Sequence, residues 1–173
     1  DPSTGSWSVT GNLVHQHGSG HTATKLRDGK VLVTGGLWEE VSESPRIPSE
    51  FAELYDPASD TWESTGNMTE GRSKHKAFLL ENGNVLVIGG SSAELYDPSK
   101  GTWSKAGNLP NDHGGQFSAT TLQDGRILVA GGGHSRWVEG VEVSPPTPID
   151  NTDIYDPSTG KWSSASNMYA PEL

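Results

Sequence analysis

The sequence predicts an all-β protein made of repeated four-stranded antiparallel units. The first observation behind this prediction is a stretch that occurs three times, at residues 21–36, 75–90 and 117–132. The second is a shorter stretch that follows each copy and runs from Tyr-Asp-Pro to a tryptophan, always at the same spacing. Similar stretches that return along a chain indicate a repeat protein in which each copy is one structural unit.

Each copy of the longer stretch is predicted to be a tight hairpin. Two runs rich in β-branched and aliphatic residues flank an Asp-Gly or Asn-Gly pair, whose glycines are Gly29, Gly83 and Gly125. Such a pair between two β-rich runs is the strongest short-range hairpin signal, and it favours a type I′ turn with positive φ at both central residues. The second strand of each hairpin ends at a Gly-Gly pair.

The shorter stretch is predicted to be a looser hairpin. Asp-Pro followed by small polar residues favours a turn, because proline fixes φ at the first corner. Two hairpins give four short strands per unit, here named a to d, and repeated four-stranded units are typical of a β-propeller blade. We expect the recurrent aromatic residues to pack between blades. They are Trp7, Tyr55, Trp62, Tyr96, Trp103, Tyr155 and Trp162.

These motifs resemble the kelch repeat. The Gly-Gly pair, followed by Tyr and Trp at fixed distances, carries the resemblance. Residues 119–132, Ala-Thr-Thr-Leu-Gln-Asp-Gly-Arg-Ile-Leu-Val-Ala-Gly-Gly, are similar to blades of secreted bacterial kelch proteins and galactose-oxidase-like propellers. The resemblance implies a kelch-type β-propeller and an extracellular or cell-surface location. It does not imply one function, because this fold hosts enzymes, glycan binders and protein-docking modules.

The repeats divide the chain into three complete blades with flanking strands. The blades are predicted at residues 11–65, 66–106 and 107–165, with insertions between strands b and c at residues 37–50 and 133–149. Residues 1–10 are predicted to be the outer strand of a preceding blade, and residues 166–173 to open a following one. Propellers have about four to eight blades. The chain is therefore either a piece of a longer protein, or one of two copies that self-associate to close a six-bladed ring.

Composition excludes several classes of function. The formal net charge of −10 argues against a nucleic-acid partner. The sequence has no apolar run of the roughly 18 residues that a membrane span needs. It has no cysteine, which excludes disulfides, thiolate metal sites and a cysteine nucleophile from this chain.

The insertions point to a candidate ligand-binding face. In a blade, the b–c and d–a connections open on the same face, and long loops in a compact repeat are usually functional. Imidazole, guanidinium and indole groups at a channel mouth suit an anionic or sugar-like ligand. The candidate ligand-binding residues are His17, His21, Trp38, Arg72, His75, His113, His134, Arg136 and Trp137.

Structural alternatives stay open for these residues. His21 and His75 share one repeat position with Phe117, and the Arg-Ser-Lys-His sequence of residues 72–75 resembles a kelch signature that has a structural role. His15, His17 and His21 have a spacing at which an extended strand would bring two imidazoles to one face. No Cys or acidic residue nearby completes the set. We therefore predict no metal site and no cofactor.

The function predicted first is a non-enzymatic recognition module that binds a protein or glycan through the b–c and d–a loops. One alternative is a part of a secreted carbohydrate-active or galactose-oxidase-like enzyme, with further catalytic groups outside this chain. The galactose-oxidase resemblance implies copper and a Tyr–Cys cross-link, which a chain without cysteine cannot form alone. A second alternative is a structural assembly unit of a surface layer or filament. No catalytic residue is predicted.

Overall fold

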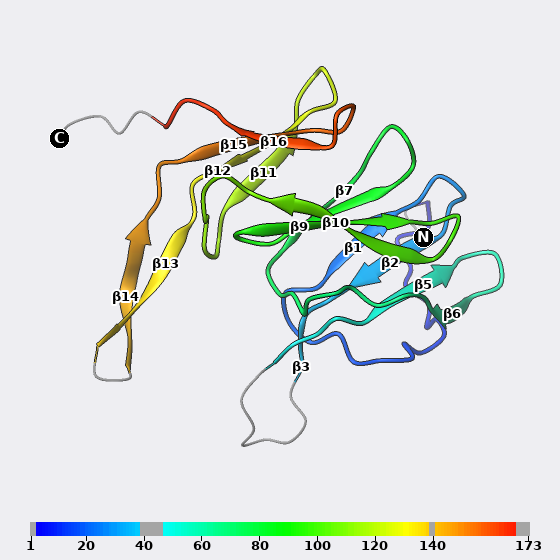
Figure 1. Ribbon diagram of the computed structural model, residues 1–173. Coiled ribbons are helices and arrows are strands. Elements are labelled where there is room, and N and C mark those ends of the chain that lie inside the picture. The colour runs from blue at the N-terminus through cyan, green and yellow to red at the C-terminus, as the bar shows by residue number, and fades with distance from the viewer. Residues whose placement is uncertain (1–2, 39–46, 139–140, 169–173) are drawn as a thin grey trace.

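The computed structural model describes residues 3–38, 47–138 and 141–168, and these residues form strands, turns and loops but no helix. Accordingly, the described residues include no helix that is long and apolar enough to cross a membrane. Twelve of the strands form three four-stranded antiparallel sheets, which lie side by side in Figure 1. Each sheet has the strand order a-b-c-d of a propeller blade, so the predicted fold class is confirmed.

The strand bounds follow the repeats. Blade 1 contains β1 (Thr22–Lys25), β2 (Val31–Thr34), β5 (Ala52–Asp56) and β6 (Thr61–Ser64). Blade 2 contains β7 (Lys76–Leu79), β8 (Val85–Ile88), β9 (Ser92–Asp97) and β10 (Thr102–Asn108). Blade 3 contains β11 (Ser118–Thr121), β12 (Ile127–Ala130), β15 (Thr152–Asp156) and β16 (Lys161–Ser164).

The turn between strands a and b differs from the predicted type I′ turn. In blade 1 only Gly29 has a positive φ, of 92°, and Asp28 does not. Leu26 N donates to Lys30 O, which leaves three residues in the loop, as in a type I turn followed by a left-handed glycine. The physical reason lies in the Asp28 side chain, which accepts a hydrogen bond from Lys30 N at 3.1 Å and so satisfies that amide. Asn82 and Asp124 make the same contact in the other blades.

Both insertions contain a second hairpin. In blade 1 it pairs β3 (Leu37–Trp38) with β4 (Ile47–Pro48), and in blade 3 it pairs β13 (Gly133–Val138) with β14 (Val141–Pro148). Figure 1 shows β3 and the β13–β14 hairpin extending away from the turns that join strands a and b. The roots of both hairpins bond to d–a connections, because Leu37 N donates to Ser19 O and Gly133 N to Gly115 O. The b–c and d–a connections therefore lie at the same end of the blades.

Residues 3–10 form a turn followed by an irregular segment, and no strand is assigned to them. A strand needs a hydrogen-bonded neighbour, and no strand of the described residues pairs with this segment. Trp7 is 99% exposed there, whereas Trp62, Trp103 and Trp162 are partly buried. The predicted inter-blade packing is thus seen for Trp103 and Trp162, which bond to carbonyls of the preceding repeat and pack against the buried core clusters, and not for Trp7.

Two of the indole nitrogens bond to carbonyls that lie in, or directly after, the outer strand of the preceding blade. Trp103 Nε1 donates to Gly66 O at 2.6 Å, and Trp162 Nε1 donates to Ala106 O at 2.9 Å. Trp62 Nε1 is buried but has no hydrogen-bond partner among the described residues. Each indole also lies beside the tyrosine of its own blade, with ring centroids 5.0 to 5.1 Å apart. Trp103 and Trp162 therefore differ from Trp62 in this hydrogen bond, and they also pack against the buried core clusters.

That difference gives a matched test of inter-blade bonding. Trp103→Phe should lower the free energy of unfolding by about 1 kcal/mol more than Trp62→Phe, because only the first loses a hydrogen bond and leaves a carbonyl unpaired. Urea denaturation of both variants measures the difference. Equal losses would show that the indole bond contributes nothing to holding blades together.

Candidate functional site

A buried carboxylate on strand c anchors the d–a connection in every blade. Glu53, Glu94 and Asp153 occupy the same repeat position and are at most 1% exposed. Each accepts backbone hydrogen bonds from the connection, from Val14 N to Glu53 and from Thr69 N to Glu94 at 2.8 Å. The third bond runs from Asn111 N to Asp153 at 2.9 Å. A buried carboxylate needs such donors, because an unpaired buried charge is costly.

Three of the predicted ligand-binding residues are the cationic or imidazole partners of these carboxylates. His17 Nε2 lies 3.3 Å from Glu53, Arg72 Nη2 lies 3.2 Å from Glu94, and His113 Nε2 lies 3.1 Å from Asp153. All three side chains are buried, and His17 and His113 also bond through Nδ1 to Gly35 O and Gly131 O. His17 Nε2 is close to Glu53 without making a hydrogen bond to it, but its Nδ1 is bonded, so we assign all three residues to anchoring the loops.

Sequence analysis did not single out the carboxylates themselves. The signal was present, because an acidic residue stands two positions before the repeated tyrosine in all three copies. An acidic residue that recurs at one position of strand c, with a histidine or arginine in each preceding loop, indicates a buried pair. The alternation of a β-strand did not reveal the buried carboxylate, because every second side chain of a strand can face solvent and an acidic residue is expected there.

The Gly-Gly pair lets the anchored loops pass close to strand b. A Cβ on Gly36 would lie 2.1 Å from His17 O, and a Cβ on Gly132 would lie 2.1 Å from His113 O. Both glycines also have a positive φ, of 107° and 111°. Any other residue at these two positions would push the d–a loop off the blade.

His75 is an inter-blade residue. Its Nε2 lies 2.9 Å from Thr22 Oγ1 and 3.0 Å from Thr34 Oγ1, both in the preceding blade. Phe117 holds the same position in blade 3 and packs into the hydrophobic cluster that includes Ile88 of blade 2. Burial, and to a lesser extent the charge of Arg72, lowers the pKa of the His75 imidazole to about 4. His75 is therefore neutral at physiological pH.

The innermost strands border a hollow that we call the channel hollow. It has a volume of about 670 Å³ and is lined by residues of β1, β7 and β11 and of the loops before them. Two predicted site residues meet here, the exposed His21 and the buried His75. Lys74 and Gln116 line the same hollow from the loops. The hollow lies within the roughly 300–1,000 Å³ that is usual for small-molecule sites.

The backbone is strained at the mouth of this hollow. Lys74 has a φ of 55° and Gln116 a φ of 62°, while Gly20 has a φ of 81° at the same repeat position. A left-handed conformation costs a non-glycine residue roughly 1–2 kcal/mol. Blades 2 and 3 thus place long polar side chains at a position where glycine would have a lower conformational energy. Such backbone strain is often found at functional sites.

The remaining predicted residues belong to the hairpins. His134 is exposed at the root of β13–β14. Trp38, Arg136 and Trp137 lie in β3 and β13, and their side chains are outside the described part of the structure. His15 stacks on Phe51 with ring centroids 4.1 Å apart, away from His17 and His21. Among the described residues, no three His, Cys, Asp or Glu side chains are placed to hold one metal ion.

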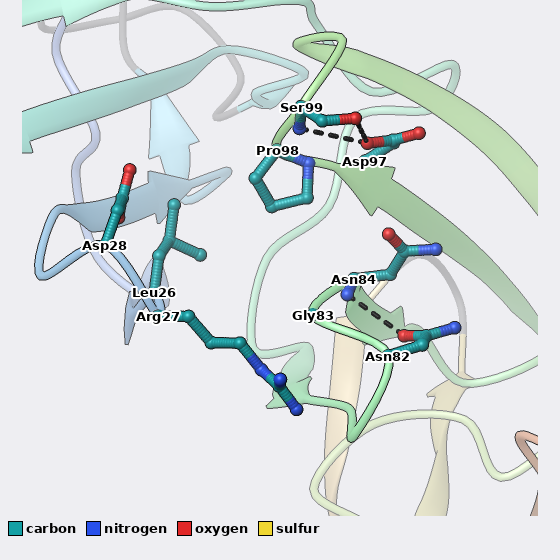
Figure 2. A pocket seen from close by; sticks show the side chains of 9 residues that line it. All are labelled: Leu26, Arg27, Asp28, Asn82, Gly83, Asn84, Asp97, Pro98 and Ser99. Carbon is teal, nitrogen blue, oxygen red and sulfur yellow. Dashed lines mark hydrogen bonds between the residues drawn. The ribbon is translucent and has the colours of Figure 1, made fainter.

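The opposite face has its own hollow, of about 450 Å³, between the turns of blades 1 and 2 (Figure 2). Its polar groups close their own turns, since Asn82 accepts from Asn84 N and Asp97 from Ser99 N. Hydrogen bonds from Lys100 and Ser99 lower the pKa of Asp97 to about 2. A similar hollow lies between the turns of blades 2 and 3, so these spaces are a by-product of the repeat.

Comparison with known proteins agrees with this geometry. Residues 116–169 match the family model of the kelch motif. The structure of YjhT is similar at 18% identity and a TM-score of 0.67, over 88% of this chain and 53% of YjhT. The fold of this chain is that of kelch-type β-propeller blades. A fungal alcohol oxidase of the AA5 family, solved in complex with copper, is similar to these kelch blades at 19% identity and a TM-score of 0.60, over 90% of this chain and 31% of the oxidase.

These structural similarities show the kelch fold alone. The chain spans about half the length of YjhT and about a third of the oxidase. No curated protein matches its sequence. What the kelch blades bind has to be argued from their own residues.

The anchoring role of the strand-c carboxylates predicts a large effect of one substitution. Glu94→Gln should lower the free energy of unfolding by about 3 kcal/mol, because it removes the buried counter-charge of Arg72 and leaves only the exposed Glu70 carboxylate, 3.1 Å from Nη2. Glu63→Gln on the exposed outer strand removes a surface ion pair with Lys30 and should cost less than about 1 kcal/mol. Chemical denaturation measures both, and similar small losses would refute the anchoring role.

The lowered pKa of His75 predicts acid sensitivity. As the pH falls from about 6.5 to about 4, His75 binds a proton in the unfolded chain but stays neutral in the folded chain. The free energy of unfolding should therefore fall by about 3 kcal/mol over this window. His75→Gln keeps polar atoms but cannot titrate. Denaturation at pH 7, 5.5 and 4.5 should therefore show a smaller loss for the variant. Parallel pH profiles would contradict the prediction.

Proposed function

We propose that the chain is a recognition module that binds a protein or glycan ligand through the face that carries the b–c hairpins and d–a loops. The observation that carries this proposal is the asymmetry of the two faces. One face has tight turns whose polar groups are internally paired, and the other has two additional hairpins beside the channel hollow. Elaborated loops on a rigid repeat scaffold are where binding residues concentrate.

Anchoring of the d–a loops supports this proposal. Buried pairs at His17, Arg72 and His113 hold the loops at fixed positions. Loops that are ordered before binding lose less conformational freedom when a ligand arrives, which favours affinity. The anchored loops would therefore present the hairpin roots and the channel hollow as a preformed surface.

The similarity to a copper-containing oxidase makes an enzyme the second candidate. The channel hollow does not fit a copper site, because its only metal-ligating residue types are His21 and His75. His75 Nε2 already bonds to two threonine hydroxyls of blade 1. An oxidase-like activity would therefore need ligands from outside this chain, and we favour the recognition module.

The test combines the hairpin residues predicted from the sequence. The triple variant with Trp38→Ala, Arg136→Ala and Trp137→Ala should bind the ligands found on a glycan array or protein array at least about tenfold more weakly, since Trp and Arg dominate binding surfaces. A control triple variant on the opposite face, Lys100→Ala, Ser99→Ala and Arg126→Ala, should bind as the unaltered protein does. If the hairpin variant keeps every interaction at full strength, this face is not the binding face.

A further inference from the structure

The lining of the channel hollow has a charge opposite to that of the chain. The chain carries a net charge of −10, yet no aspartate or glutamate lines this hollow. Its charged lining residues are Lys74 and Lys76, and His21 adds an exposed imidazole. Positive groups that converge on one hollow attract a negatively charged ligand group, and no carboxylate in the lining of this hollow opposes that attraction.

The two ammonium groups are not committed to protein partners. Within the described residues, neither Lys74 nor Lys76 has an ion pair or a side-chain hydrogen bond, whereas Lys30 lies 2.8 Å from Glu63 on the outer strand. Lys76 is the first residue of β7, whose position in the sheet is fixed by pairing with β8. Lys76 therefore stands on a strand and Lys74 on an exposed loop, and within the described residues neither ammonium group has a protein partner.

The loop geometry holds Lys74 at the hollow. Lys74 N donates to Gly20 O at 2.8 Å, which ties the loop of blade 2 to the loop of blade 1. The residue keeps a strained backbone there, as does Gln116 in blade 3, although glycine fills the position in blade 1. A lysine and a glutamine retained at a strained position supply a charge and an amide donor that glycine would not.

We propose that the channel hollow binds the anionic group of a small, hydroxyl-bearing ligand. Lys74 and Lys76 supply the opposite charge, and Gln116 and Thr24 supply hydrogen bonds to its neutral part. The proposal rests on the proposed function, because it names the ligand class for the same face. The volume of about 670 Å³ matches a small molecule or one terminal unit of a glycan better than a folded protein surface.

The test uses three probes that share a ring and differ in charge at one carbon: glucose, glucuronate and glucose 6-phosphate. Calorimetric titration at low salt should give binding of one or both anions at least about tenfold tighter than binding of glucose, and about 0.5 M salt should weaken it. A preference between the two anions separates a carboxylate ligand from a phosphate ligand. Equal binding of glucose, or no binding of any probe, overturns the proposal.

Variants tie the binding to the lysines. Lys74→Gln with Lys76→Gln should weaken anion binding about tenfold, while the matched pair Lys105→Gln with Lys161→Gln, on the exposed outer strands, should leave it unchanged. Lys74→Gly relieves the strained backbone, so it should weaken binding without lowering the melting temperature. Full anion binding in both lysine-to-glutamine pairs would also overturn the proposal.

The hairpin variant separates this proposal from the proposed function. If the Trp38, Arg136 and Trp137 triple variant loses its array ligands while the lysine pair leaves anion binding intact, the recognition face stands and the anion site falls. If the lysine pair loses anion binding while the hairpin variant keeps its array ligands, the anion site stands and the hairpins are not part of it.

Discussion

The contacts of the buried strand-c carboxylate are the interactions on which the face that carries the b–c hairpins and d–a loops depends. In each blade this carboxylate gathers backbone amides and one cationic or imidazole side chain from the d–a connection. In blades 1 and 3 that connection then crosses the Gly-Gly pair at a distance no other residue would permit. The loop before strand a is thereby fixed, and with it the residues that line the channel. The d–a loops are thus held by buried contacts between a strand-c carboxylate and a histidine or arginine side chain.

The residue just before strand a has the same polarity as the residues that it contacts in the preceding blade. His75 meets two threonine hydroxyls of blade 1, and Phe117 packs in a cluster with Ile88 of blade 2. The same repeat position thus carries either a polar or an apolar inter-blade contact, according to the end of strand b in the preceding blade. His21 lies in the hollow as an exposed residue because no preceding blade covers it among the described residues. A repeated residue type is therefore weak evidence of a repeated role.

Strand positions could be predicted from the sequence because they follow from local chemistry. Turn glycines, Asp-Pro pairs and runs such as Val31–Thr34 are read within a few residues, and the four-stranded blades follow. The turn type was wrong because it depends on whether the Asp28 side chain bonds to the next amide but one. The directions of His17, Arg72 and His113 could not be read, because a histidine or arginine before a channel strand can point outward or back into its own blade. Only the carboxylate partners, which are distant in sequence, decide between the two.

One short loop combines a residue that anchors the blade with a residue that lines the channel hollow. Arg72 points into the blade and is buried against Glu94, while Lys74, two residues later, lines the channel hollow in a strained conformation. The buried pair compensates for the strain, because the loop cannot relax without breaking the contacts of Glu94. An anchor of this kind lets a repeat vary the residue at the mouth of the channel while its fold is maintained. Gly20, Lys74 and Gln116 are three such choices at one position, and they make the channel wall of these blades chemically uneven although the blades themselves are alike.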